Sequence, residues 1–252
     1  MLLRLQKGII YGPVNSRRLG WSLGINILPS NKKVCAFNCV YCQYGWTKIH
    51  KSSGKKLQGL PSVQAVGKAL KKALNSLPSP PAYITFSGNG EPTLHPDFDQ
   101  ILDDVLALRN LLAPLTKTAV LSNSALVTDK SIRKALMKLD AKIMKLDCGS
   151  PGLFEKYNQP CCGIDIEDIT EGLSRLPDVT IQALVSTGKS GNLNQKNINA
   201  WIERLLRIKP SFVQLYTLDR DYPAKDLSPV PREELKRIKT QVQEAGLSAE
   251  IY

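Results

Sequence analysis

Three cysteines lie close together near the start of the chain. They are Cys35, Cys39 and Cys42, in the segment Cys-Ala-Phe-Asn-Cys-Val-Tyr-Cys, which has the spacing C-x3-C-x2-C. Thiolates are the usual ligands of iron–sulfur clusters, and a [4Fe–4S] cube has four irons to ligate. Three cysteines therefore leave one iron open, and a small molecule can chelate it.

A zinc ion held by the three cysteines and His50 is the alternative interpretation of these thiols. His50 follows Cys42 within a stretch rich in lysine and glycine, with no evident turn to bring it back. The alternative from a different class of protein is accordingly a non-catalytic zinc and RNA-binding module. The spacing itself favours an iron–sulfur cluster.

A second motif, Ser-Gly-Asn-Gly-Glu-Pro-Thr, covers residues 87–93 and follows an apolar run at 82–86. Glycine allows backbone conformations that other residues avoid, and it lets a ligand come close to the main chain. The segment Gly88, Asn89, Gly90 and Glu91 is thus a candidate binding strip. A tight turn between a strand and a helix is the alternative role.

The elements that must position these motifs alternate along the chain. Short β-branched runs predict strands at 22–28, 82–86, 117–121, 141–146, 178–185 and 211–217, with a last short strand at 248–251. Amphipathic stretches predict helices at 62–77, 97–112, 129–139, 165–175, 195–208 and 231–245, with a shorter turn near 151–157.

Alternation of this kind predicts an α/β fold with a parallel sheet and helices outside it. Six such units fit a partial (β/α)6 barrel in one domain over 1–252, with 1–21 as an extension leading into the first strand. A doubly wound open sheet is the alternative. In a barrel the loops after the strands carry the chemistry, and both motifs follow predicted strands.

Composition limits the class of protein. Of 252 residues, 42% are hydrophobic and 22% are charged, which is typical of a globular chain. No apolar run approaches the roughly 20 residues of a membrane span, and the N-terminus lacks the long apolar region of a signal peptide. Clustered cysteines without a secretory signal predict metal binding rather than disulfides. We expect a cytoplasmic protein with no membrane partner.

The formal net charge of +12 is compatible with a polyanionic partner such as RNA, or with general solubility. Basic residues are frequent on both sides of the cysteines, and several are expected near the mouth of the site: Arg17, Arg18, Lys32, Lys33, Lys48, Lys51, Lys55, Lys56, Lys68, Lys71 and Lys72.

The triad, with Tyr41 just before its last cysteine, resembles the signature of the radical S-adenosylmethionine (SAM) superfamily. The resemblance implies that SAM chelates the open iron through its amino and carboxylate groups. An electron from a donor such as flavodoxin or ferredoxin then cleaves SAM to methionine and a 5′-deoxyadenosyl radical. It also implies that Gly88, Asn89, Gly90 and Glu91 bind the methionine end of SAM.

Two further polar residues stand at the ends of predicted strands. Asn123 and Asp147 are candidates for the ribose hydroxyls of SAM, with helix or turn capping as the alternative role. The remaining cysteines, Cys148, Cys161 and Cys162, could bind an auxiliary cluster or serve in redox chemistry. Free cysteine is also a common small buried residue, and a structural role is the interpretation we favour.

A closer resemblance, to the radical SAM group related to the wyosine-base synthases, extends over most of the chain. It rests on Gly-Pro-Val-Asn-Ser-Arg-Arg-Leu-Gly at 12–20, the two motifs above, and the segments 121–123, 145–147, 157–160 and 213–215. Wyosine synthases act on tRNA, so the resemblance makes tRNA a candidate partner. Archaeal members carry further cysteines ahead of the triad for a second cluster, whereas this sequence has none before Cys35.

The sequence therefore predicts a radical SAM enzyme whose substrate and net reaction it does not define. An activase that places a glycyl radical on a partner protein is the alternative enzyme.

Overall fold

A computed structural model describes residues 1–54 and 56–252. Lys55, one of the basic residues expected near the site, lies outside the described residues.

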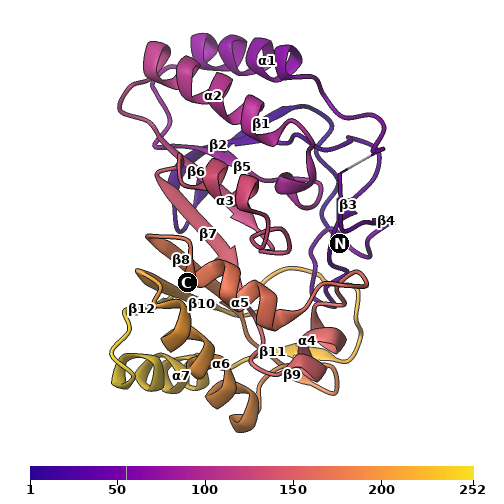
Figure 1. The fold of residues 1–252 in the computed structure, drawn as a ribbon, viewed down its shortest axis with the longest axis vertical. Helices are drawn as coiled ribbons and strands as arrows, with labels where there is room; N and C mark the ends of the chain where they lie inside the picture. The colour runs from indigo at the N-terminus through magenta and orange to yellow at the C-terminus, as the bar shows by residue number, and fades with distance from the viewer. Residues whose placement is uncertain (55) are drawn as a thin grey trace.

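One eight-stranded sheet forms the centre of the molecule (Figure 1). Its spatial order is β1 (Ile10–Ser16), β2 (Gly20–Ile25), β5 (Tyr83–Phe86), β6 (Lys117–Ser122), β7 (Ala141–Lys145), β8 (Val179–Leu184), β10 (Phe212–Tyr216) and β12 (Ala249–Ile251). Every neighbouring pair is parallel except β1 and β2. The strands follow one another in chain order, without the reversal that defines a doubly wound sheet.

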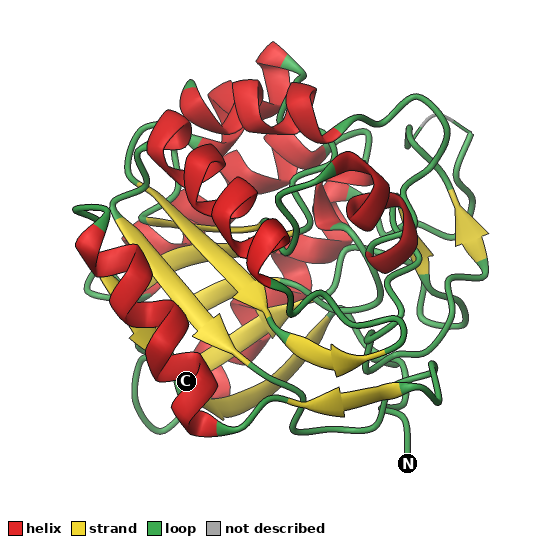
Figure 2. Ribbon diagram, turned by 90° about the horizontal axis from the view of Figure 1, so that it is seen from below, coloured by secondary structure: helices red, strands yellow, loops and turns green. Residues whose placement is uncertain are grey.

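The helices lie around the curved sheet (Figure 2). They are α1 (Val63–Ser76), α2 (Phe98–Leu112), α3 (Lys130–Leu136), α4 (Pro151–Tyr157), α5 (Ile166–Ser174), α6 (Gln195–Ile208) and α7 (Arg232–Glu244), with a short 3-10 turn, η1, at Pro92–Leu94. Their starts follow local chemistry: the Ser62 hydroxyl accepts from the Ala65 amide and the Asn194 side chain from the Asn197 amide. The prediction of a partial (β/α)6 barrel is confirmed, and the doubly wound alternative is wrong.

Two very short strand pairs lie outside the main sheet. β3 (Val34–Cys35) pairs in parallel with β4 (Ile49–His50), and β9 (Ser186–Gly188) pairs antiparallel with β11 (Leu227–Pro229). The first pair holds the start of the cysteine motif beside the lysine-rich stretch that follows it.

The segment expected as a simple extension forms a hairpin instead. β1 runs antiparallel to β2, and the tip at 17–19 reaches the end of β10, where Arg18 stacks on Tyr216. There Arg17 forms an ion pair of 2.5 Å with Asp219, just beyond β10. Leu19 is buried with Ala119 and Ile143 of β6 and β7. The hairpin therefore crosses the open side of the partial barrel, and Leu19 fills its base.

Among the described residues, no helix combines the length and the apolar character needed to cross a bilayer.

Candidate functional site

The cysteine loop is joined directly to the glycine strip. The Val34 amide donates to the Asn89 carbonyl at 3.0 Å, and the Glu91 amide donates to the Val34 carbonyl at 3.0 Å. Gly90 has a φ of +141°, and a Cβ there would lie 1.6 Å from the Val34 carbonyl oxygen. Glycine is therefore required at this position, because only a residue without a side chain lets β3 pair with the strip.

Glu91 connects the glycine strip to the end of β6. One carboxylate oxygen accepts from the Thr93 amide at 3.0 Å and the Ser122 hydroxyl at 2.9 Å, and the other accepts from the Asn123 amide at 2.6 Å. The side chain is almost fully buried, and burial raises the pKa of this carboxyl above its ordinary value. Glu91 also lines the cavity described below.

Asn89 points away from the cavity. Its side chain accepts from the Gln6 amide at 2.7 Å and donates to the carbonyls of Gln6 and Pro29, each at 2.9 Å. Its own amide donates to the Asn26 side chain at 3.0 Å. These contacts hold the N-terminal segment and β2 against the strip, and they use the polar groups that we expected to face SAM.

Asn123 lies beside the first cysteine. Its amide nitrogen is 3.4 Å from the Cys35 sulfur, and its side-chain oxygen accepts from the Ala125 amide at 2.9 Å. The second contact closes the turn after β6, so the capping alternative applies to this residue. The first contact fixes the orientation of Cys35.

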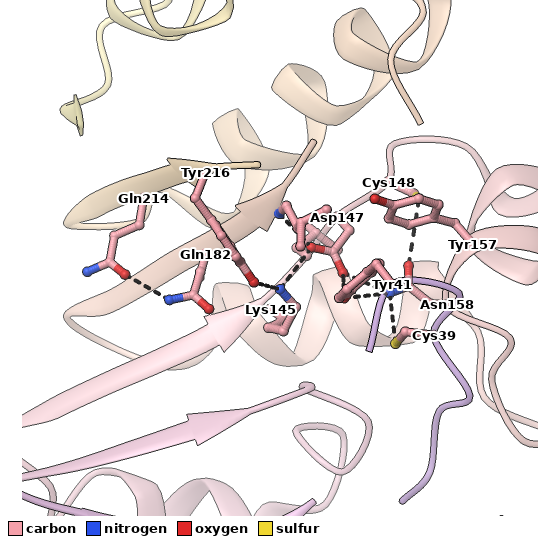
Figure 3. A network of polar contacts seen from close by, with 12 residues as sticks. Cys39, Tyr41, Lys145, Asp147, Cys148, Tyr157, Asn158, Gln182, Gln214 and Tyr216 are labelled. Atoms are coloured by element: carbon pink, nitrogen blue, oxygen red, sulfur yellow. Dashed lines mark hydrogen bonds and ion pairs between the residues drawn. The ribbon is translucent and has the colours of Figure 1, made fainter. Parts of the chain in front are cut away.

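Asp147 holds the second cysteine through a buried polar network (Figure 3). Its carboxylate accepts from the Leu184 amide at 2.9 Å, from the Asn158 amide nitrogen at 2.8 Å and from the Tyr41 hydroxyl. The same Asn158 nitrogen lies 3.5 Å from the Cys39 sulfur. Asp147 therefore supports the cysteine motif from behind.

Two lysines of the site had no role in the sequence-based prediction of binding residues. Lys145, at the end of β7, forms an ion pair of 3.1 Å with Asp147 and donates to the Tyr216 hydroxyl at 2.7 Å. Lys33 is buried just before β3, where its ammonium donates to the Gly45 carbonyl at 2.8 Å. Burial lowers the pKa of Lys33, but the adjacent Cys42 and Cys35 more than offset this, and the pKa is raised. Their positions in the sequence could have identified them as site residues: Lys33 lies just before the cysteine triad, and Lys145 lies at the end of a predicted strand.

A cavity of about 410 Å³ brings these residues together. It falls within the usual range of small-molecule sites, about 300–1,000 Å³. Of the nine residues predicted to bind the cluster or SAM, seven line it: Cys35, Cys39, Cys42, Gly88, Gly90, Glu91 and Asn123. Arg17, Arg18 and Lys33, which were expected near its mouth, line it too. Asn89 and Asp147 are not among its lining residues.

The three cysteines that line the cavity form a donor set suited to a [4Fe–4S] cluster. Within 1–54 and 56–252, no three His, Cys, Asp or Glu side chains converge so that they could hold a single ion. A [4Fe–4S] cube instead distributes three thiolates over three different irons. His50, the proposed fourth zinc ligand, has its Nε2 3.0 Å from the Ala36 carbonyl oxygen. Burial raises the pKa of Cys39 to about 11, so iron binding must displace the thiol protons.

The other three cysteines lie outside this cavity. Cys148 is buried with its sulfur 3.6 Å from the Asn158 side-chain oxygen, whereas Cys161 is half-buried and Cys162 exposed. The Cys161 amide donates to the Ala36 carbonyl at 2.9 Å, which ties this turn to the triad loop through the main chain.

The fold and the site define a class of protein, and comparison with known families agrees. Residues 33–204 match the Radical SAM superfamily, and the chain belongs to that superfamily. It is an enzyme, and its cofactors are a [4Fe–4S] cluster and SAM. The alternative of a non-catalytic zinc and RNA-binding module is therefore wrong.

Several curated relatives carry the name UPF0026 protein. The chain is 35% identical to the one from Synechocystis sp., over 85% of this chain and 77% of that protein. It is 33% identical to the one from Helicobacter pylori strain 26695, over 84% of this chain and 67% of that protein.

Solved structures show the same fold at low sequence identity. SuiB of Streptococcus suis bound to S-adenosylmethionine is 16% identical with a TM-score of 0.64, and the match covers 91% of this chain and 50% of SuiB. TYW1 with a lysine–pyruvate adduct bound is 17% identical with a TM-score of 0.64, covering 88% of this chain and 73% of TYW1.

Proposed function

We propose that the 410 Å³ cavity is the SAM and cluster site of a radical SAM enzyme. The observation that carries the proposal is that Cys35, Cys39 and Cys42 line one cavity together with the glycine strip, which the chain bonds directly to the cysteine loop. When both cofactors are bound and the cluster is reduced, they supply a 5′-deoxyadenosyl radical that abstracts hydrogen from a substrate.

Different residues of the cavity bind the cluster and SAM. The three thiolates ligate three irons, and Lys33 offsets the negative charge that they gain. Gly88 and Gly90 let the methionine end of SAM approach the main chain, and Glu91 accepts from its ammonium group. Asn123 orients Cys35; the ribose contact predicted for it stays a prediction. Asp147 and Asn89 position the cysteine loop and the strip from behind, and we assign them no contact with SAM.

The test is anaerobic reconstitution of the wild-type protein and of Cys39→Ala. The wild type should hold about four irons and four sulfides and form 5′-deoxyadenosine from SAM after reduction. The variant should lose the cluster or the cleavage of SAM, because a second iron is left without a protein ligand. Cys162→Ala, which removes an exposed thiol outside the cavity, is the matched control. Undiminished iron content and deoxyadenosine formation in Cys39→Ala would refute the assignment.

We also propose tRNA as the macromolecule that carries the substrate. Three lysines, the half-buried Lys32 and the exposed Lys48 and Lys51, flank the β3–β4 pair that contains Cys35. The net charge of +12 points the same way. Lys68, Lys71 and Lys72, which we expected near the site, lie instead on α1, away from β3 and β4 (Figure 1).

Those two lysine sets provide a test with an internal control. Each phosphate contact contributes roughly 0.7–0.9 to the slope of log affinity against log salt. Changing Lys32, Lys48 and Lys51 to glutamine should lower that slope for bulk tRNA by about 2–3, whereas the same change at the three α1 lysines should not. Equal slopes for the two triple variants would contradict the tRNA proposal and leave the cofactor site untouched.

Two further assignments follow from the same chemistry. We infer that flavodoxin or ferredoxin supplies the electron and that the enzyme works in the cytoplasm, where thiols stay reduced for cluster ligation. The alternative substrate, a partner protein that receives a glycyl radical, would be indicated by a radical signal that stays on that protein after SAM cleavage.

A further inference from the structure

Arg18 presents buried polar atoms without partners at the cavity. It follows Arg17 at the tip of the β1–β2 hairpin and lines the cavity. Its Nε and Nη2 atoms are buried, and neither has a hydrogen-bond partner among the residues described. A buried donor left without an acceptor destabilises the fold, and more so when it is charged. Native proteins keep few such groups, and each requires an explanation.

The position of this guanidinium is built by the fold. Its central carbon lies 4.4 Å from the ring centroid of Tyr216 and 5.4 Å from that of Tyr252, which places the cation against two aromatic faces. The next residue, Leu19, is buried in the base of the barrel with Ala119 and Ile143. The two rings hold the guanidinium, and the buried Leu19 anchors the main chain next to it. Arg18 therefore differs from a surface arginine, whose side chain ends free in solvent.

Two carboxylates of this region already have other cationic partners. Asp219 pairs with Arg17 at 2.5 Å, and Asp147 pairs with Lys145 at 3.1 Å. No ion pair involves Arg18 within the described part of the chain. A guanidinium stays protonated at neutral pH. The cavity therefore carries an unmatched positive charge at this point.

SAM does not account for this charge. Gly88, Gly90 and Glu91 follow β5, whereas Arg18 stacks on Tyr216 at the end of β10. The strands β6, β7 and β8 lie between them, and neighbouring strands are about 4.8 Å apart along the curved sheet. The amino and carboxylate groups of SAM share one carbon atom, so both must lie at the β5 wall if Glu91 binds the amine. Arg18 lines the cavity where it stacks on Tyr216, at the end of β10.

We propose that Arg18 binds an oxyanion, a carboxylate or a phosphate, of the substrate on which the radical acts. The inference rests on the proposed SAM site, because that site defines which part of the cavity remains for substrate. The planar fork of arginine matches both oxyanions through paired N–H···O bonds. The anion would give the buried nitrogens their missing acceptors and would fix the substrate between the hairpin and β10.

The experiment uses the reconstituted protein with SAM bound, under anaerobic conditions. Inorganic phosphate and acetate are titrated in separate arms by calorimetry at constant ionic strength, so that the two sources of the oxyanion are distinguished. The variants are Arg18→Gln, Arg18→Lys and Arg17→Gln. Arg17 is the matched control, because it is the adjacent arginine at the same mouth but has a carboxylate partner.

At least one of the two anions should bind the wild type and bind at least tenfold more weakly to Arg18→Gln. Arg17→Gln should stay within twofold of the wild type. Arg18→Lys, which keeps the charge and fills much of the volume, should lie between them and guards against loss of folding in the glutamine variant. The affinity for SAM, measured without added anion, should be the same in all four proteins within threefold.

Three results would overturn the inference: neither anion binds the wild type, both arginine→glutamine variants weaken binding equally, or Arg18→Gln weakens SAM as much as the anion. The last result would make Arg18 a ligand of SAM and would leave the proposed function standing. A wild-type protein that binds phosphate or acetate but neither binds nor cleaves SAM would instead refute the proposed function.

Discussion

The exchange Asp147→Asn tests whether the buried network behind Cys39 determines the stability of the site. The Asp147 carboxylate accepts from four donors: the Leu184 amide, the Asn158 amide nitrogen, the Tyr41 hydroxyl and the Lys145 ammonium. Asparagine has the same shape but only one acceptor oxygen. Its NH2 group would face donors that need an acceptor, and Lys145 would lose its charged partner.

The magnitude follows from burial. The Asp147 side chain is 0% exposed and that of Lys145 is 19% exposed, so solvent can compensate little. Removing one partner of a buried ion pair costs about 3–5 kcal/mol. We expect the free energy of unfolding to fall by about that amount. A surface pair gives the contrast: Asp99 and Lys138 lie 2.8 Å apart but are 60% and 36% exposed, and such pairs contribute about 0–1 kcal/mol.

The raised pKa of Lys145 determines at which pH unfolding should be measured. Burial lowers the pKa of Lys145, but the adjacent Asp147 carboxylate and Tyr216 more than offset this, and the pKa is raised. A raised pKa stabilises the fold fully below the unfolded value of about 10.4, and this contribution is lost as the pH rises through the folded value. The full effect is therefore present at pH 7–8.

The assay is anaerobic urea unfolding of the reconstituted proteins, followed by far-UV circular dichroism, with iron content measured in parallel. Asp147→Asn should unfold at much lower urea and hold less iron, whereas Asp99→Asn should match the wild type. Adding Lys145→Met to Asp147→Asn should restore part of the loss, because the orphaned ammonium is removed. A cost no larger than that of Asp99→Asn, or a double variant no more stable than Asp147→Asn, would refute the reasoning.

Three further predictions follow. Gly90→Ala should bind SAM at least tenfold more weakly in equilibrium dialysis, because its Cβ would lie 1.6 Å from the Val34 carbonyl oxygen, whereas Gly152→Ala, with nothing within 4 Å, should match the wild type. Glu167 has its pKa lowered to about 2 by hydrogen bonds from Arg204 and Arg207. The stability that these ion pairs add is fully present above the unfolded pKa of glutamate, about 4.3, and is lost as pH falls toward the folded pKa. The difference in melting temperature between Glu167→Gln and wild type should therefore shrink as pH falls from 6 to 3. Wild-type iron content should survive in a triple alanine variant that removes Cys148, Cys161 and Cys162; a wild-type content of about eight irons that falls to about four in the variant would reveal a second cluster.

The long elements were predictable from the sequence because burial of one face imposes a period. The predicted helix at 97–112 is α2 (Phe98–Leu112), and the predicted strand at 178–185 is β8 (Val179–Leu184). Pairs of two or three residues, such as β3 with β4, have no period to detect. β1 escaped prediction for another reason: it contains Gly12 and Pro13, which usually interrupt a strand.

The sequence allowed us to predict which strand end carries each residue of the site, but not which way its side chain points. The carboxyl ends of β2 and β5 are neighbours, so the cysteine loop and the glycine strip were expected together. Which way a side chain turns depends on its partners from elsewhere in the chain. Asn89 turns toward Gln6, 83 residues away in sequence, and Asp147 turns toward Tyr41, 106 residues away.

The cations that line the cavity differ in whether the chain supplies a carboxylate partner, and this difference indicates two separate anionic ligands. Arg17 and Lys145 each have a carboxylate within the chain, which balances them whatever the cavity holds. Lys33 and Arg18 form no ion pair among the described residues. Lys33 faces the three thiols, which become anionic only when iron binds, so its charge is matched by the cluster. Arg18 stacks on Tyr216 at the end of β10, and under the proposal above its charge is matched by an anion of the substrate. The wyosine-like segment at 12–20 supplies this arginine and closes the barrel around it, so the part of the sequence that distinguishes the group also forms the wall that would select its substrate.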